Sequence, residues 1–207
     1  MHAIQAGDNR YVCPFCRSPG ITQEEYIKRM KKRVEGDDAV AIDQLGCDYR
    51  DGDMGLRQDY DKANELWLRA GELGQATAYT NLGVAYAKGE GVEKNMKKAK
   101  YYFELAAMGG DVNARYKLGM FEMLEEGNYN NRAVKHWMIS AGAGHDESLS
   151  EIRECFMDGC ATKNDFEKAL RAHKDAADKM RSEQREEVAA LLAAGLRHAD
   201  WSHACFG

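Results

Sequence analysis

The chain has 207 residues, of which 30% are charged, and its net charge is −5. An acidic chain without a block of lysine or arginine is a poor partner for nucleic acid or an anionic membrane, so we expect neither. No apolar run approaches the ~20 residues needed to cross a bilayer, and the first residues lack the apolar core of a signal peptide. The six cysteines are not spaced in step with the internal repeat of the chain, which favours free thiols in a reducing compartment, the cytoplasm or the nucleus.

The first 36 residues contain a short cysteine motif and one predicted helix. The motif reads Cys13-Pro14-Phe15-Cys16-Arg17. We expect residues 1–20 to be disordered. Thr22 is a suitable N-cap for a helix over residues 21–36, because its hydroxyl can accept a hydrogen bond from the first turn. Gly36 is suited to end that helix.

Residues 37–180 consist of four segments that repeat with a period of about 36 residues. The first half of each segment contains an aliphatic core position: Leu45, Leu82, Leu118 and Ile152. The second half contains a basic residue and an alanine, followed by a larger ring: Trp67, Phe103, Trp137 and, in the fourth segment, His173. A fixed period of this size indicates stacked helical hairpins. We therefore predict an all-α fold, a right-handed α/α superhelix of about four hairpins.

Three of the predicted first helices carry a glycine in their interior, at Gly46, Gly83 and Gly119. Each costs about 1 kcal/mol relative to alanine. We attribute the presence of these glycines to a second helix that packs closely on the first, since only a missing Cβ allows such an approach. The ring of the second helix is expected to fill the groove between hairpins.

Residues 181–207 follow the array. Four aliphatic side chains fall on one face of a helix there: Val188, Leu191, Leu192 and Leu196. We predict a capping helix with a tail, because an end repeat has to cover its apolar flank.

The repeat pattern resembles the Sel-one-like repeat (SLR), a relative of the tetratricopeptide repeat. The second segment matches best, including its loop over residues 88–95, whereas the third has a shorter loop and Glu122 in place of a tyrosine. The resemblance covers residues 37–180. It implies an α/α superhelix that scaffolds protein complexes, often in ubiquitin-linked degradation or signalling.

The N-terminal motif resembles the last ligand pair of a RING finger, in which two cysteines bind zinc and the next arginine contacts ubiquitin and the conjugating enzyme. The resemblance implies Cys13 and Cys16 as metal ligands. Only twelve residues precede Cys13, and tetrahedral zinc needs four ligands. We therefore expect no cofactor, and zinc only if an upstream RING half is present; the alternative is a cysteine pair that binds no metal.

The predicted partner-binding surface is the concave face formed by the first helices. The residue before each aliphatic core position points away from the core: Gln44, Asn81, Lys117 and Glu151. A row of mixed polar side chains suits a protein or peptide in the concave groove. Ordinary solvated surface is the alternative for each single residue.

No nucleophile with a base, phosphate-binding loop or carboxylate pair stands out in the sequence. We therefore predict no enzymatic activity, and a scaffold or adaptor for protein–protein interactions. The alternative is the substrate-binding part of a RING-type ubiquitin ligase whose zinc-binding half is missing from this chain. That alternative adds a ubiquitin-conjugating enzyme as a partner.

Overall fold

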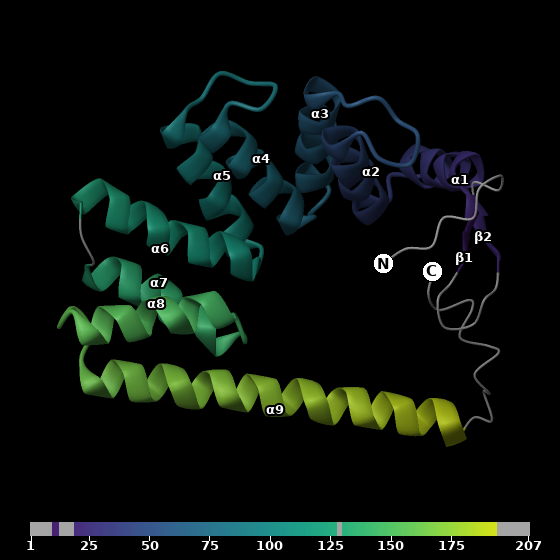
Figure 1. Ribbon diagram of the computed structural model, residues 1–207. Helices are drawn as coiled ribbons and strands as arrows, with labels where there is room; N and C mark the ends of the chain where they lie inside the picture. Colours follow the sequence, from purple (N-terminus) through teal and green to yellow (C-terminus); the bar gives the residue numbers. More distant parts are fainter. Residues whose placement is uncertain (1–9, 13–18, 128–129, 194–207) are drawn as a thin grey trace.

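The computed structural model describes residues 10–12, 19–127 and 130–193 (Figure 1). Two short strands precede the helices: β1 (Arg10–Val12) and β2 (Pro19–Thr22). The helices in these ranges are α1 (Gln23–Glu35), α2 (Ala39–Asp51), α3 (Tyr60–Glu72), α4 (Ala76–Lys88), α5 (Met96–Met108), α6 (Val112–Glu126), α7 (Asn131–Gly142), α8 (Asp146–Met157) and α9 (Lys163–Ala193). None of these helices is both long and apolar enough to span a bilayer.

The two strands pair in an antiparallel arrangement, with Arg10 opposite Thr22 and Val12 opposite Pro19. Residues 1–20 were expected to be disordered, so the strands at 10–12 and 19–20 differ from that prediction. Tyrosine and valine favour extended backbone in β1. Pro19 opens β2, where the absence of its N–H is tolerated.

Thr22 caps the first helix as the sequence predicts, but the helix covers residues 23–35, and residues 21 and 22 belong to β2. The Thr22 hydroxyl accepts a hydrogen bond from the Glu25 backbone at 3.2 Å, and the Glu25 carboxylate accepts one from the Thr22 backbone at 3.0 Å. This reciprocal capping satisfies two backbone donors that a helix start leaves free. Met30 of α1 is buried against Ala41 and Leu45 of α2. Helix α1 therefore covers the open flank of the first hairpin.

Helices α2 to α9 form four consecutive hairpins, which confirms the predicted solenoid class (Figure 1). The pairs are α2 with α3, α4 with α5, α6 with α7, and α8 with α9. Most of these helices begin at an aspartate or asparagine whose side chain accepts a backbone hydrogen bond, as Asp38, Asp59 and Asn95 do. The core is divided into clusters that follow one another along the array.

The interior glycines accommodate the large rings of the second helices. A Cβ added at Gly46 would lie 2.6 Å from Trp67 Nε1, and one added at Gly83 would lie 2.6 Å from Phe103 Cε1. These contacts confirm that the missing Cβ permits the close approach. They also refine the prediction, because each ring packs on the glycine of its own hairpin. Trp67 additionally joins a cluster with Leu82 of the next hairpin.

The fourth hairpin continues directly into the C-terminal helix, so the predicted boundary at residue 180 does not exist as a helix end. Helix α9 is 31 residues long. Earlier second helices are followed by glycines with positive φ, at Gly74, Gly110 and Gly144. Met180 occupies the next place in that series. Without a residue that favours the left-handed conformation, the helix continues.

Candidate protein-binding surfaces

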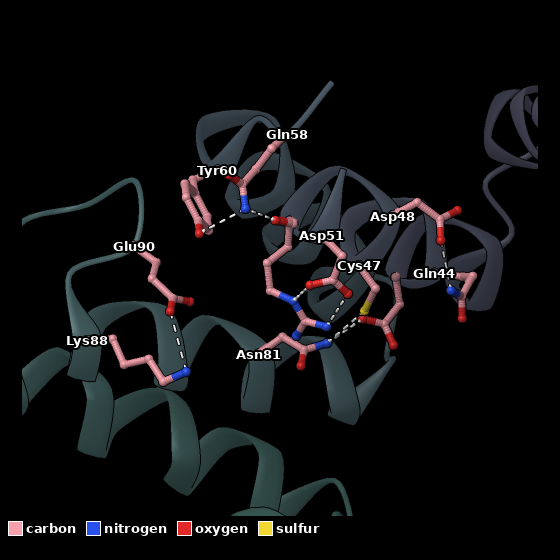
Figure 2. Close-up of polar contacts among 11 residues, drawn as sticks. Gln44, Cys47, Asp48, Asp51, Gln58, Tyr60, Asn81, Lys88 and Glu90 are labelled. Carbon is pink, nitrogen blue, oxygen red and sulfur yellow. Dashed lines mark hydrogen bonds and ion pairs between the residues drawn. The ribbon is translucent and has the colours of Figure 1, made fainter. Parts of the chain in front are cut away.

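The predicted row on the first helices is only partly free to meet a partner. Gln44 is exposed on α2, and its amide donates to Asp48 Oδ1 at 3.1 Å (Figure 2). Asn81 is half-buried on α4 and donates to Asp43 Oδ1 at 2.9 Å. Asn81 thus joins two successive first helices.

The other two residues of the row lie further along the array. Lys117 is half-buried on α6. Glu151 is half-buried on α8 and accepts a hydrogen bond of 3.4 Å from the Tyr116 hydroxyl of α6. Burial raises the pKa of Glu151, although the Tyr116 hydrogen bond opposes this shift. Partner binding by the row stays a prediction, with Gln44 the most accessible of the four.

A polar cluster between α2 and α4 surrounds Asp43, which the sequence analysis did not single out. Asp43 is 8% exposed and accepts hydrogen bonds from Asn81 and, at 3.4 Å, from Gln75. Burial raises its pKa, although both hydrogen bonds act in the opposite direction. The sequence offers one signal for this role. Asp43 is a charged residue in a helix segment where Ile42 and Leu45 are buried.

Cys47 lies beside this cluster, next to Asn81 (Figure 2), and the charge of Arg50 acts on both Asp43 and Cys47. Asn81 Nδ2 is 3.7 Å from Cys47 Sγ. Burial, together with the charge of Asp43, raises the pKa of the Cys47 thiol. Arg50 donates two hydrogen bonds of 2.7 Å to Asp51 and lies over the Trp67 ring at 5.8 Å. The contacts of Asn81 and Arg50 join α2 to α4 and α3. Burial and the charge of Asp43 keep the thiol in its weakly nucleophilic protonated form, although the charge of Arg50 acts in the opposite direction.

A pocket of about 340 Å³ lies between α5 and α6. Its lining residues are Met96, Lys97, Lys100, Tyr101, Glu104, Phe121, Leu124 and Glu125. We call this surface the α5/α6 groove. Three of its large apolar side chains are exposed: Met96 at 41%, Tyr101 at 55% and Leu124 at 62%. Apolar surface gathered in a concave site is typical of a binding surface.

An ion-pair network borders the α5/α6 groove. Lys100 Nζ lies 3.1 Å from Glu122 Oε1 and 2.7 Å from Glu125 Oε2. Burial raises the pKa of Glu122, but the Lys100 hydrogen bond and the charges of Lys100 and Arg132 outweigh burial, so that the pKa falls below its ordinary value. In the sequence, Glu122 is recognisable only as a departure from the tyrosine of the repeat, without a link to a surface.

Metal binding has no support in the part of the chain that the structure describes. No group of three or more histidine, cysteine, aspartate or glutamate side chains able to hold a metal ion occurs there. Cys13 and Cys16, the predicted metal ligands, lie outside the described residues.

A family comparison agrees with the hairpin boundaries. A model of the Sel1 repeat matches residues 39–75 and 76–111. The first match spans α2 and α3, and the second spans α4 and α5. Residues 39–111 of the chain therefore match two Sel1 repeats. This confirms the resemblance to the Sel-one-like repeat, and the two matched Sel1 repeats are those with the longer loops.

Proteins similar to this chain include one from a plant and two from bacteria. The ERAD-associated E3 ubiquitin-protein ligase component HRD3B of Arabidopsis thaliana is 33% identical over 115 residues, which is 55% of this chain and 18% of HRD3B. A Sel1 repeat protein from Oxalobacter formigenes superposes with a TM-score of 0.65 at 28% identity, over 75% of this chain and 64% of that one. A protective antigen of uropathogenic Escherichia coli with an SLR fold gives 0.62 at 25% identity, over 86% and 37%. The chain therefore spans less than two thirds of each relative.

Proposed function

We propose that this protein is a non-enzymatic scaffold that binds other proteins, in the cytoplasm or the nucleus. The observation that carries the proposal is the α5/α6 groove, where Met96, Tyr101 and Leu124 are exposed together. Exposed apolar side chains cost free energy in water, and a partner that covers them recovers it. The row on the first helices is a second surface that the same partner or another can contact.

The environments of two described cysteines, Cys47 and Cys155, argue against a nucleophilic role for these thiols. Burial raises the pKa of Cys47, and it raises the pKa of Cys155 to about 12. Both thiols are therefore protonated at neutral pH, whereas a nucleophilic cysteine needs its pKa lowered.

Affinity capture with matched variants tests the scaffold. Tagged wild-type chain, Tyr101→Lys, a Gln44→Ala/Lys117→Ala double variant and Met108→Lys are compared after washing in moderate salt. Met108 is 74% exposed at the far end of α5, outside the groove, so Met108→Lys is the control. We expect a discrete set of proteins that Tyr101→Lys or the double variant loses and Met108→Lys keeps. If the wild-type chain captures no more proteins than the tag alone, the proposal is refuted.

A second candidate is a subunit of a ubiquitin-ligase complex, and it is favoured by the likeness to HRD3B. In this role the repeats bind the substrate or another subunit, and Cys13 and Cys16 bind zinc only with ligands that another segment supplies. We expect captured complexes to form ubiquitin chains when ubiquitin, activating enzyme and conjugating enzymes are added, and the purified chain alone to form none and to hold no stoichiometric zinc. If the purified chain alone forms ubiquitin chains and Arg17→Ala removes this activity, the chain is a ubiquitin ligase and the scaffold proposal is wrong.

A further inference from the structure

The loop inside each of the first two hairpins packs on the helix that precedes the hairpin. In the second hairpin, Asn64 Nδ2 of α3 donates to the Glu90 carbonyl at 2.9 Å. A Cβ added at Gly91 would lie 2.6 Å from Tyr60 Cβ of α3. Val92 packs against the same core cluster as Trp67. The loop over residues 89–95 therefore covers the groove between α3 and α4.

The first hairpin shows the same arrangement one step earlier. A Cβ added at Gly55 would lie 3.2 Å from Gln23 Oε1 of α1, and Leu56 packs against the cluster that contains Met30 of α1. A hairpin loop that covers the preceding groove thus occurs in both of the first two hairpins.

The third hairpin has a shorter connection. Helix α6 extends to Glu126 and α7 begins at Asn131, which leaves residues 127–130, whereas residues 89–95 connect α4 to α5. The groove that corresponds to the one under residues 89–95 is the α5/α6 groove, and it is the groove that remains open as a pocket. The shorter connection of the third hairpin thus coincides with a pocket in the equivalent groove.

The walls of the two grooves differ in chemistry. In the covered groove, Lys88 of α4 pairs with the Glu90 carboxylate of the loop at 3.4 Å. The position equivalent to Lys88 in α6 is Leu124, and the position equivalent to Tyr60 is Met96. The position that pairs with a carboxylate in the α3/α4 groove is therefore apolar in the α5/α6 groove.

Three charged side chains line the α5 side of the open groove: Lys97, Lys100 and Glu104. Lys97 is exposed in the first turn of α5, which has no acidic residue, and a helix N-terminus adds partial positive charge. Lys97 makes no ion pair with any residue that the structure describes. Lys100, by contrast, is already paired with Glu122 and Glu125.

We propose that the α5/α6 groove binds a loop of a partner protein, in the place that residues 89–95 occupy one repeat earlier. The proposal rests on the scaffold function. The bound loop has a large apolar side chain that packs against Met96, Tyr101 and Leu124, and a neighbouring carboxylate that pairs with Lys97. This pairing follows from the charge and the apolar surface of the walls.

A pair of peptides tests the proposed chemistry. One fluorescein-labelled heptapeptide has the sequence of residues 89–95, and the second is the same peptide with Glu90→Leu. Fluorescence anisotropy against the full chain should show tighter binding of the leucine peptide. In a Leu124→Lys variant the preference should reverse by tenfold or more, because the variant restores the lysine of the covered groove. The control Met108→Lys should leave the preference for the leucine peptide unchanged. Equal binding of both peptides to wild type and Leu124→Lys overturns the proposal.

A loop graft tests the site in the folded chain without changing its walls. Residues 127–130 are replaced by the sequence of residues 89–95 with Glu90→Leu, and thermal melting verifies that the variant is folded. We expect the graft to weaken leucine-peptide binding at least tenfold, because the longer loop covers the groove. Unchanged peptide binding by the folded graft overturns the proposal that the groove is the binding site. The proposal is also overturned if the wild-type chain forms a dimer that the graft abolishes, because the groove would then bind a second copy of this chain. If wild type and graft capture the same proteins, the scaffold function stands, and only the proposal that the α5/α6 groove binds them is wrong.

Discussion

At the scale of single residues, the third hairpin replaces one kind of contact by another. Lys62 lies over the Tyr49 ring at 5.1 Å, and Lys98 lies over the Tyr86 ring at 5.1 Å. The equivalent tyrosine in the third hairpin is Glu122, and the equivalent lysine is Arg132. Arg132 Nη1 lies 3.6 Å from Glu122 Oε2, so an ion pair takes the place of a cation–π contact. Lys100 then contributes the second positive charge that a mostly buried carboxylate needs.

We predict that Lys100→Met destabilises the chain by about 2 kcal/mol at pH 7, because it leaves Glu122 mostly buried with only Arg132 as a charged partner. The exposed Lys97→Met is the control and should change stability by less than about 0.5 kcal/mol. Urea denaturation measures both.

The cost of Lys100→Met should shrink as the pH falls. The pKa of Glu122 is lowered in the folded chain, so its stabilising contribution is present above the ordinary carboxyl pKa and is lost as the pH falls through the lowered value. A cost that is the same at pH 7 and pH 3.5 would show that charge is not its origin.

A second residue-scale prediction concerns Gly83. Gly83→Leu should destabilise by about 1–3 kcal/mol or more, since its side chain would overlap the buried Phe103 ring. Lys88→Leu is the control on the same helix, where the lysine side chain is 63% exposed and pairs only with Glu90. Urea midpoints distinguish the two, and equal midpoints would contradict the packing of ring on glycine.

At the scale of helices, α9 is the exception to the hairpin pattern. Its first part contacts α7 and α8, and it then extends toward the side of the molecule where α1 and the strands lie (Figure 1). The Met180 methyl lies 3.1 Å from the position of a Cβ at Gly144. The residue that replaces a helix-ending glycine is thus itself used to cover the end of the third hairpin.

We predict that Met180→Ala destabilises by about 1 kcal/mol through loss of this contact, given that half of the side chain is exposed. Lys179→Ala, at a neighbouring position that is mostly exposed, should lie within about 0.5 kcal/mol of wild type. Thermal melting of the two variants checks this. A Lys179→Ala effect as large as that of Met180→Ala would mean that helix propensity, and not the contact, stabilises α9 here.

At the scale of the whole molecule, stability is the sum of local contributions. Each core cluster combines neighbouring helices only: one contains Ile42, Trp67 and Leu82, and a separate one contains Trp137 and Ile152. In an array of this kind each repeat interacts with its neighbours and with nothing beyond them.

We predict that Ile42→Ala, which removes a fully buried side chain at a cost of about 2–5 kcal/mol, lowers amide protection in α2 to α4 and leaves α8 and α9 nearly unchanged. Hydrogen exchange followed by mass spectrometry reports each helix separately. An equal loss of protection along the whole chain would indicate a single cooperative unit.

The sequence by itself determined the hairpins, because their signals are local. Caps such as Thr22 and Asp38 bond within one turn of their own helix, and the glycine and ring that pack together lie in one hairpin. The same signals located the third-hairpin departures, the short loop and Glu122. The strands at residues 10–12 and 19–22 were not predicted, since strand pairing depends on a second segment. The uninterrupted α9 was not predicted either, although Met180 in place of the helix-ending glycine is a local signal for it.

The tertiary structure alone decided which polar side chains are available and which groove is open. Asn81 and Glu151 follow the same register as Gln44, yet each bonds to the neighbouring first helix, a contact that joins residues more than thirty positions apart. The α5/α6 groove depends on a loop in one hairpin that packs on the helix of the preceding hairpin, as Glu90 does on Asn64. Periodicity specifies which residues share a face of one helix, whereas contacts between hairpins fix what covers that face.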